Sequence, residues 1–234
     1  MSEAAKLEKT AREERWATTY AKQGYLVVRQ LYPPAEMVSW KQHIQDAMRD
    51  DGSLNDPSGV RVWKAGAIDS GLAAWMTEPK VVQVLRTLIG PKIEFLSVKA
   101  VFKNAAHAFG SPWHQDWFYW EGAPKLSVWL ALDDATPANG CLKMIPGSHH
   151  QIHRMVRADD GLGFARRVED DAIRGRSVDS IEVARGDAVF FHDLTLHSSY
   201  PNTSGADRWS LISTYRDASV PDSSTTWSAS VICD

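Results

Sequence analysis

A histidine and an aspartate stand two positions apart at His114 and Asp116, inside the segment WHQDWFYW at residues 113–120. If this segment is a strand, side chains at i and i+2 share a face, so both point the same way while Gln115 points to the opposite face. His197, in the segment TLHSSY, lies 81 residues after Asp116 and offers a third ligand. Two imidazole nitrogens and one carboxylate on one face of an octahedron leave three positions open, the arrangement associated with non-haem Fe(II) oxygenases. We therefore predict that His114, Asp116 and His197 are catalytic metal ligands.

The histidine–aspartate pair alone is weak evidence, because a structural histidine beside a capping or ion-paired aspartate gives the same pattern. Arg208 strengthens the metal hypothesis, since it follows His197 by eleven residues across the turn-rich segment PNTSGAD. A hairpin there can return Arg208 to the neighbouring strand near the metal. Arg208 and Ser210 stand at i and i+2 and share a face. A guanidinium fork beside a hydroxyl matches the two oxygens of a carboxylate, which predicts a carboxylate clamp.

His192 is the alternative third ligand. It lies five residues before His197, so the two face opposite sides of a regular strand and only one can point inward. The spacing to Arg208 favours His197. We expect His192 to pair with Asp193 instead.

The elements that must position these residues divide the chain in two. Residues 1–90 predict helices over 2–23, 35–48 and 80–90, with a strand inserted at 24–31 and a loop at 49–59. From residue 92 onward, short apolar runs separated by turn residues predict strands, WHQDWFYW among them. Such a series is typical of a barrel or a double-sheet jelly roll.

Composition excludes several classes of function. A hydrophobic content of 44% argues against disorder, and a net charge of −3 gives no positive field for nucleic acid or an anionic membrane surface. The two cysteines, Cys141 and Cys233, are far apart and form neither a disulfide framework nor a zinc–thiolate motif. With no apolar signal-peptide core or membrane-length apolar run, we expect a cytoplasmic protein without nucleic-acid or membrane partners.

Three segments together resemble the phytanoyl-CoA dioxygenase family of Fe(II)/2-oxoglutarate-dependent oxygenases. They are WHQDWFYW, VWLALDDATPANGCLKMIPGSHH and GDAVFFHDLTLHSSYPNTSGADRWS, within residues 90–216. The resemblance implies one mainly β domain over residues 1–234. This domain would be a double-stranded β-helix (a cupin-like jelly roll) over about 91–220, with N-terminal flanking helices over about 1–90.

The same resemblance implies the reaction and its cofactors. It predicts Fe(II), 2-oxoglutarate as cosubstrate and O2, with ascorbate as a candidate stimulant. The expected activity is hydroxylation of a small organic molecule with release of succinate and CO2. The sequence fixes neither the substrate nor the oligomeric state, and it leaves desaturation and ring chemistry open.

Site residues can be carried over by position. The family's metal ligands fall on His114, Asp116 and His197, and its 2-oxoglutarate-binding arginine falls on Arg208. Trp129, ten residues before the Asn139-Gly140 turn, matches a tryptophan that lines the cosubstrate site.

Two lysines are carried over more loosely. Lys99, fifteen residues before His114, falls where a relative has a cosubstrate-contacting side chain of another type. Lys64, in VWKAG, resembles a family lysine, although the intervening length differs. The predicted cofactor-binding set is therefore Arg208, Trp129, Ser210, Lys99 and Lys64.

Two other functions stay open at this point. One is a non-oxidative hydrolase or isomerase with Zn(II) on the same three ligands, which would leave Arg208 without a purpose. The other is a catalytically silent ligand-binding or sensing jelly roll, against which the intact ligand set and arginine speak. Phe118 and Trp120 are either barrel packing or a substrate wall. The arginine-rich segment 151–180, which includes Asp159 and Asp160, is either a solvated excursion or a lid for an anionic substrate group.

Overall fold

The structure is a computed structural model that describes residues 2–56, 58–158 and 164–233. Its α-helices are α1 (Glu3–Gln23), α2 (Pro34–Asp50), α3 (Ser70–Met76) and α4 (Pro79–Ile89). Its strands are β1 (Tyr25–Val28), β2 (Val60–Lys64), β3 (Ile93–Lys103), β4 (Leu126–Ala131), β5 (Leu142–Met144), β6 (Met155–Arg157), β7 (Arg166–Val168), β8 (Asp179–Ile181), β9 (Ala188–His192), β10 (His197–Ser199), β11 (Arg208–Asp217) and β12 (Val231–Cys233).

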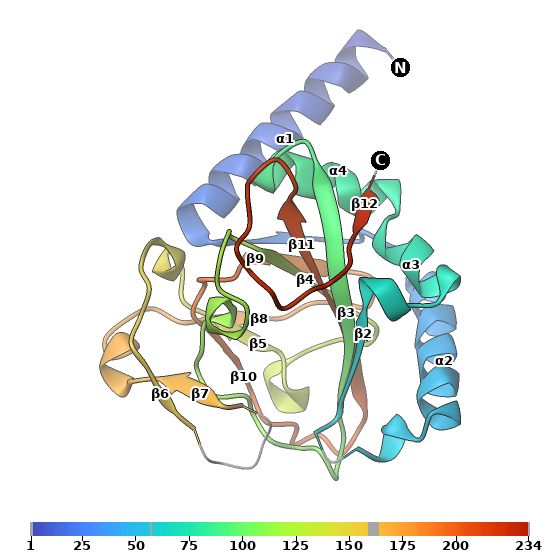
Figure 1. The fold of residues 1–234 in the computed structure, drawn as a ribbon, viewed down its shortest axis with the longest axis vertical. Helices are drawn as coiled ribbons and strands as arrows, with labels where there is room; N and C mark the ends of the chain where they lie inside the picture. Colours follow the sequence, from blue (N-terminus) through green and yellow to red (C-terminus); the bar gives the residue numbers. More distant parts are fainter. Residues whose placement is uncertain (1, 57, 159–163, 234) are drawn as a thin grey trace.

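Two antiparallel sheets form the body of the molecule (Figure 1). The larger has the order β1-β9-β4-β11-β3-β12, with β2 also paired to β3, and the smaller has the order β10-β5-β8. Side chains from both sheets share one buried cluster, in which Trp129 and Phe191 of the larger sheet meet Leu142 and Met144 of the smaller. This confirms the mainly β, jelly-roll fold.

The helices cover the outer face of the larger sheet. In α2, the predicted apolar stripe of Met37, Trp40, Ile44 and Met48 is buried. These side chains belong to the same core as Val98, Ala100 and Phe102 of β3. Because successive strand residues alternate between faces, the other face of β3 carries Lys99 and Lys103 inward, away from the helices.

Several elements differ from the sequence prediction. The strand predicted for WHQDWFYW is wrong: His114 forms an isolated bridge with His197, and a 3-10 helix, η3 (Asp116–Tyr119), begins directly after it. Neither α3 nor the edge strands β2 and β12 were expected. The larger sheet therefore takes β1 and β2 from the N-terminal part and β12 from beyond residue 220.

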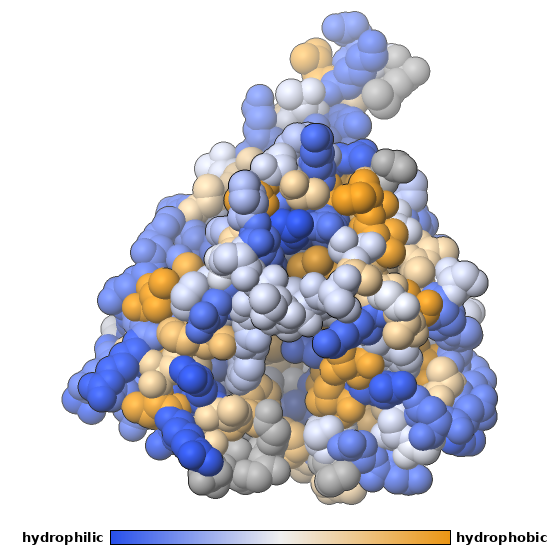
Figure 2. All heavy atoms as spheres, viewed as in Figure 1, coloured by the Kyte–Doolittle hydropathy of each residue, from blue (hydrophilic) through white to orange (hydrophobic). Residues whose placement is uncertain are grey.

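The segment 151–180 folds as an excursion between β5 and β8. It contains the two-stranded pair β6–β7 and a 3-10 helix, η6 (Asp170–Ala172). Asp159 and Asp160 lie outside the described residues. Figure 2 shows a recess in the lower half of the face drawn, with hydrophobic side chains beside it. None of the described helices is long and apolar enough to cross a membrane.

Candidate active site

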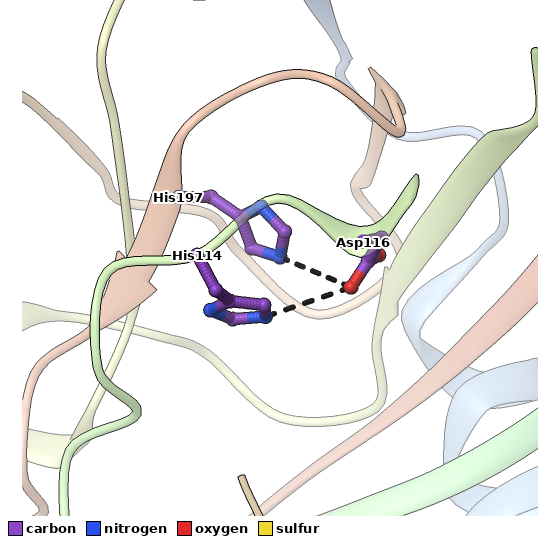
Figure 3. Close-up of side chains that lie close together, drawn as sticks. All are labelled: His114, Asp116 and His197. Atoms are coloured by element: carbon purple, nitrogen blue, oxygen red, sulfur yellow. Dashed lines mark ion pairs between the residues drawn. The ribbon is translucent and has the colours of Figure 1, made fainter. Parts of the chain in front are cut away.

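Three side chains converge between the sheets. The ligand atoms of His114, Asp116 and His197 all lie within 4.8 Å of one another, and all three residues are buried. Oδ1 of Asp116 is 3.5 Å from Nε2 of His114 and 3.8 Å from Nε2 of His197. Figure 3 shows both rings pointing at this carboxylate. Two nitrogens and an oxygen at this spacing fit a single divalent ion, and in the described residues no other group of three such side chains does.

The backbone fixes which ring nitrogen faces the centre. Nδ1 of His114 is 2.8 Å from the carbonyl oxygen of Pro112, and Nδ1 of His197 is 2.9 Å from that of Thr195. A carbonyl oxygen only accepts, so each Nδ1 carries the proton and donates it. Each Nε2 is then left with a free lone pair directed at Asp116. This is the tautomer and orientation that a metal-ligating histidine needs.

A paired backbone holds the two histidines side by side. The N–H of His114 donates to the carbonyl of His197 at 3.0 Å, and the N–H of His197 donates back at 3.1 Å. Asp116 starts η3, whose Trp117 N–H donates to the carbonyl of Asp193 at 3.1 Å. A bridge followed by one tight turn therefore presents His114 and Asp116 on the same side.

The site favours the protonation states of metal ligands. Burial, followed by the neighbouring His114, lowers the pKa of His197 to about 4, so this imidazole is neutral at physiological pH. Burial opposes ionisation of Asp116, but the two histidines and Lys99 outweigh it and hold the pKa of Asp116 well below its usual range. Neutral imidazole and ionised carboxylate are the forms that bind metal.

Gln115 points away from the centre, as predicted, and anchors the surrounding loops. Its Nε2 donates to the carbonyls of Gln151 at 2.8 Å and Leu194 at 2.6 Å, and its Oε1 accepts from the N–H of His153 at 2.9 Å. The residue between the two candidate ligands thus ties the segment to the turn between β9 and β10 and to the 151–180 excursion.

Arg208 lines the same cavity. It is 2% exposed, its guanidinium donates to Oγ of Ser210 at 2.9 Å and to the carbonyl of Gly140 at 3.2 Å, and it lies 5.4 Å from the ring centre of Trp129. Its Nε is buried without a hydrogen-bond partner in the described residues. A buried guanidinium whose hydrogen-bond partners are both neutral, and which keeps an unused donor, calls for an anion. The predicted grouping of Arg208, Ser210 and Trp129 is present.

Lys103 is a buried cation that the sequence analysis missed. It pairs with Arg208 in the β3–β11 register, and its Nζ donates to Oγ of Ser199 and to the carbonyls of Phe109 and Tyr200 at 2.6–2.8 Å. Burial, followed by the charge of Arg208, lowers the pKa of Lys103 to about 7. Strand parity could have found it, since Lys103 and Lys99 share a face of one strand.

The two predicted lysines have different positions. Lys99 lines the cavity beside the candidate ligands. Lys64 is exposed, donates to the carbonyl of Thr226 at 3.2 Å and is not among the cavity-lining residues in the described part of the chain. The structure therefore brings Lys99, but not Lys64, to the site.

The cavity has a volume of about 480 Å³, within the usual range for small-molecule sites. Beyond the polar floor its wall is apolar and aromatic, with Val60, Val62, Tyr119, Trp120 and Phe164 among its members. The rings of Phe164 and His114 pack edge to face, with 4.9 Å between their centroids. Of the two aromatic residues considered for a substrate wall, Trp120 lines the cavity, whereas Phe118 is absent from its described lining.

His192 is outside this cavity. Its Nδ1 is 3.0 Å from Oδ1 of Asp193, the pairing expected from the sequence, and its ring faces His149 at 5.6 Å and Tyr20 at 6.5 Å. His197 lines the cavity and His192 does not, as predicted, but the reason given from strand parity is wrong: His192 ends β9 and His197 begins β10, so the two do not share one strand.

Comparison with known proteins agrees with this geometry. The sequence model of the phytanoyl-CoA dioxygenase (PhyH) family matches residues 20–210. The chain belongs to this family. A probable phytanoyl-CoA dioxygenase from Caenorhabditis elegans is 27% identical over 215 residues, which cover 78% of this chain and 68% of the relative. The L-proline trans-4-hydroxylase of Streptomyces griseoviridis is 33% identical over 159 residues, 58% of this chain and 59% of the relative. For several curated relatives, including this hydroxylase, the aligned region thus spans less than two thirds of their length.

Solved structures share the fold of this PhyH-family chain. The epimerase SnoN in complex with Fe3+, alpha ketoglutarate and nogalamycin RO has a TM-score of 0.71 at 21% identity, covering 89% of this chain and 85% of that one. The non-heme monooxygenase ThoJ has a TM-score of 0.75 at 18% identity, covering 93% and 83%. The chain is an enzyme of the non-haem iron, 2-oxoglutarate-dependent oxygenase group, and the cofactors of its family are Fe(II), 2-oxoglutarate and O2.

Proposed function

We propose that this enzyme hydroxylates a small organic molecule with release of succinate and CO2. The observation that carries the proposal is the joint presence, in one cavity, of a convergent His114–Asp116–His197 set and a buried, unsaturated Arg208. Three ligands hold the metal and leave three positions for other molecules. Arg208 makes a second part of the cavity cationic, and binding a carboxylate of the cosubstrate would give this charge a role.

The residues that line the site divide the proposed reaction between them. His114, Asp116 and His197 bind Fe(II), and their backbone-fixed rings keep the ligand atoms in place without reorganisation. Arg208, with Ser210 beside it and Trp129 against its face, binds the distal carboxylate of 2-oxoglutarate. The aromatic wall excludes water and orients the substrate.

When bound, the metal and cosubstrate supply the oxidation. In the proposed reaction one atom of O2 would enter succinate and the other would enter the substrate as hydroxyl, while 2-oxoglutarate would lose CO2. The four electrons that reduce O2 come from this oxidative decarboxylation and from the substrate C–H bond. A zinc hydrolase would use the same three ligands but would have no role for Arg208.

The test is succinate release against a panel of small metabolites, with Fe(II), 2-oxoglutarate and ascorbate. For any compound that stimulates release, we expect one oxygen-18 atom in the product and one in succinate under labelled O2. His150→Ala, which changes an exposed histidine, should match the parent enzyme. An enzyme that turns over a substrate without consuming 2-oxoglutarate would contradict the proposal.

A further inference from the structure

Lys99 is a cation in the cavity that the proposed reaction does not use. It lies at the centre of β3, paired in register with Val62 of β2 on one side and Ile212 of β11 on the other. Both neighbours are apolar. Among the described residues, no hydrogen bond or ion pair engages the Lys99 ammonium, although the side chain is only partly exposed and lines the cavity. A partly desolvated ammonium between apolar neighbours is costly unless a ligand pairs with it.

With Fe(II) and 2-oxoglutarate bound, the other charges of the site would balance without Lys99. The two positive charges of Fe(II) and the one of Arg208 balance the carboxylate of Asp116 and the two carboxylates of 2-oxoglutarate. Lys103 has no donor to offer a further ligand, because its three ammonium hydrogens are taken by three neutral oxygens of the protein. Lys99 acts on the Asp116 carboxylate only through its charge, and among the described residues no hydrogen bond or ion pair engages its ammonium, so this cation is free to pair with a further anion.

Its position also separates Lys99 from the cosubstrate clamp. Lys103 and Arg208 face each other at one end of β3, and Lys99 stands four residues farther along the strand. At roughly 3.3 Å per residue, the Cα atoms of Lys99 and Lys103 are about 13 Å apart. Lys99 and the apolar residues Val60 and Val62 of the neighbouring strand β2 line the same cavity.

We propose that Lys99 binds an anionic group of the substrate, a carboxylate or a phosphate, while the rest of the substrate packs on the apolar and aromatic wall. The inference rests on the proposed function and narrows its substrate to small organic acids. The substrate body would lie between Lys99 and the ring of Trp120. Neutral compounds of the same shape would bind less well because they leave the ammonium unpaired.

The test is a binding measurement that needs no turnover. Protein loaded with Mn(II) and 2-oxoglutarate is titrated calorimetrically with 3-phenylpropionate and, separately, with its neutral amide. The acid is expected to bind about tenfold more tightly than the amide, or better, since pairing a partly buried charge is worth at least that factor. Lys99→Met should reduce the ratio to about one, and Lys99→Arg should keep it. Lys92→Met removes an exposed lysine beside the start of β3 and should behave as the parent does.

The 2-oxoglutarate titration separates this inference from the proposed function. Lys99→Met should bind 2-oxoglutarate within about twofold of the parent. A variant that loses 2-oxoglutarate affinity would place Lys99 in the cosubstrate site and overturn the inference, while leaving the proposed function standing. Equal binding of acid and amide by the parent, or no binding of either at millimolar concentration, would overturn it as well. If the parent itself does not bind 2-oxoglutarate, the proposed function fails.

Discussion

His114 has one ring nitrogen engaged by the Pro112 carbonyl and the other directed at Asp116. We expect His114→Ala to lower Fe(II) affinity by more than about 100-fold, since even loss of a residue that only supports a ligand typically costs 10–100-fold. The fold should persist, because the jelly-roll core does not include this side chain. Equilibrium titration with Fe(II) measures the affinity, and circular dichroism checks that the variant is folded. His150→Ala is the control. Unchanged iron binding would remove His114 from the metal site.

Arg208 gives a second, separable prediction. Arg208→Met should weaken 2-oxoglutarate binding by at least about 30-fold and leave metal affinity nearly unchanged, because truncating one partner of a buried charge pair costs about 2–5 kcal/mol. Arg12→Met, in the α1 helix, should have no effect on either. Anaerobic calorimetry measures the dissociation constant for Fe(II) and then, on the Fe(II)-bound protein, the one for 2-oxoglutarate. Parent-like cosubstrate affinity in Arg208→Met would show that the carboxylate binds elsewhere.

Lys103 should give the protein a distinctive pH dependence of stability. Its pKa is lowered to about 7 by burial first and then by Arg208 and Lys143, with Cys141 opposing. Between pH 7 and the unfolded value near 10.4, the unfolded chain binds more protons than the folded protein does. The Lys103 contribution therefore makes stability rise with pH across this window, by at most about 1.4 kcal/mol per unit. The free energy of unfolding of the parent and of Lys103→Met, measured by denaturant at pH 7.5 and 9.5, isolates the Lys103 contribution. The same change in stability between the two pH values in both proteins would contradict the lowered pKa of Lys103.

The element that carries Asp116 is held by a buried network. Oδ2 of Asp193 accepts from Nε1 of Trp120 and from the backbone N–H of Lys125, both at 2.9 Å. The Lys125 ammonium is fully buried and lies 2.8 Å from Oδ2 of Asp222, in the C-terminal segment. This network joins η3, β4 and the chain after β11.

Removing one member of that ion pair should cost stability. Lys125→Met leaves the Asp222 carboxylate without its partner, so we expect a loss of about 3 kcal/mol in the free energy of unfolding. The exposed pair Arg174–Asp171 is the matched control, and Arg174→Ala should change stability by less than about 0.5 kcal/mol. Urea titration compares the two, and a loss no larger than the control's would mean that the pair contributes little.

The predictability of the elements follows from where their hydrogen bonds go. The stripe of α2 and the run of β3 are readable because their periodicity is local. The η3 turn after His114 was not readable, since its Trp117 N–H donates to the carbonyl of Asp193, 76 residues farther along the chain. The side-by-side arrangement of His114 and Asp116 was nevertheless expected correctly, although for a strand rather than for a bridge and a tight turn.

Across the whole molecule, the helices cover one face of the larger sheet and leave the other face to the cavity (Figure 1). Periodicity and the family resemblance were enough to expect this architecture. They did not reveal Lys103 or separate the roles of Lys99 and Lys64, because those depend on which strands pair and where the cavity ends. Long-range register brings these residues together, and a single sequence does not display it.

The most direct measurement is diffraction from crystals grown anaerobically with Fe(II) and 2-oxoglutarate, with anomalous data at the iron edge. The account predicts one iron peak bound by Nε2 of His114, Nε2 of His197 and a carboxylate oxygen of Asp116. The distal carboxylate of 2-oxoglutarate should lie on the Arg208 guanidinium. Iron at His192, or 2-oxoglutarate bound away from Arg208, would contradict it.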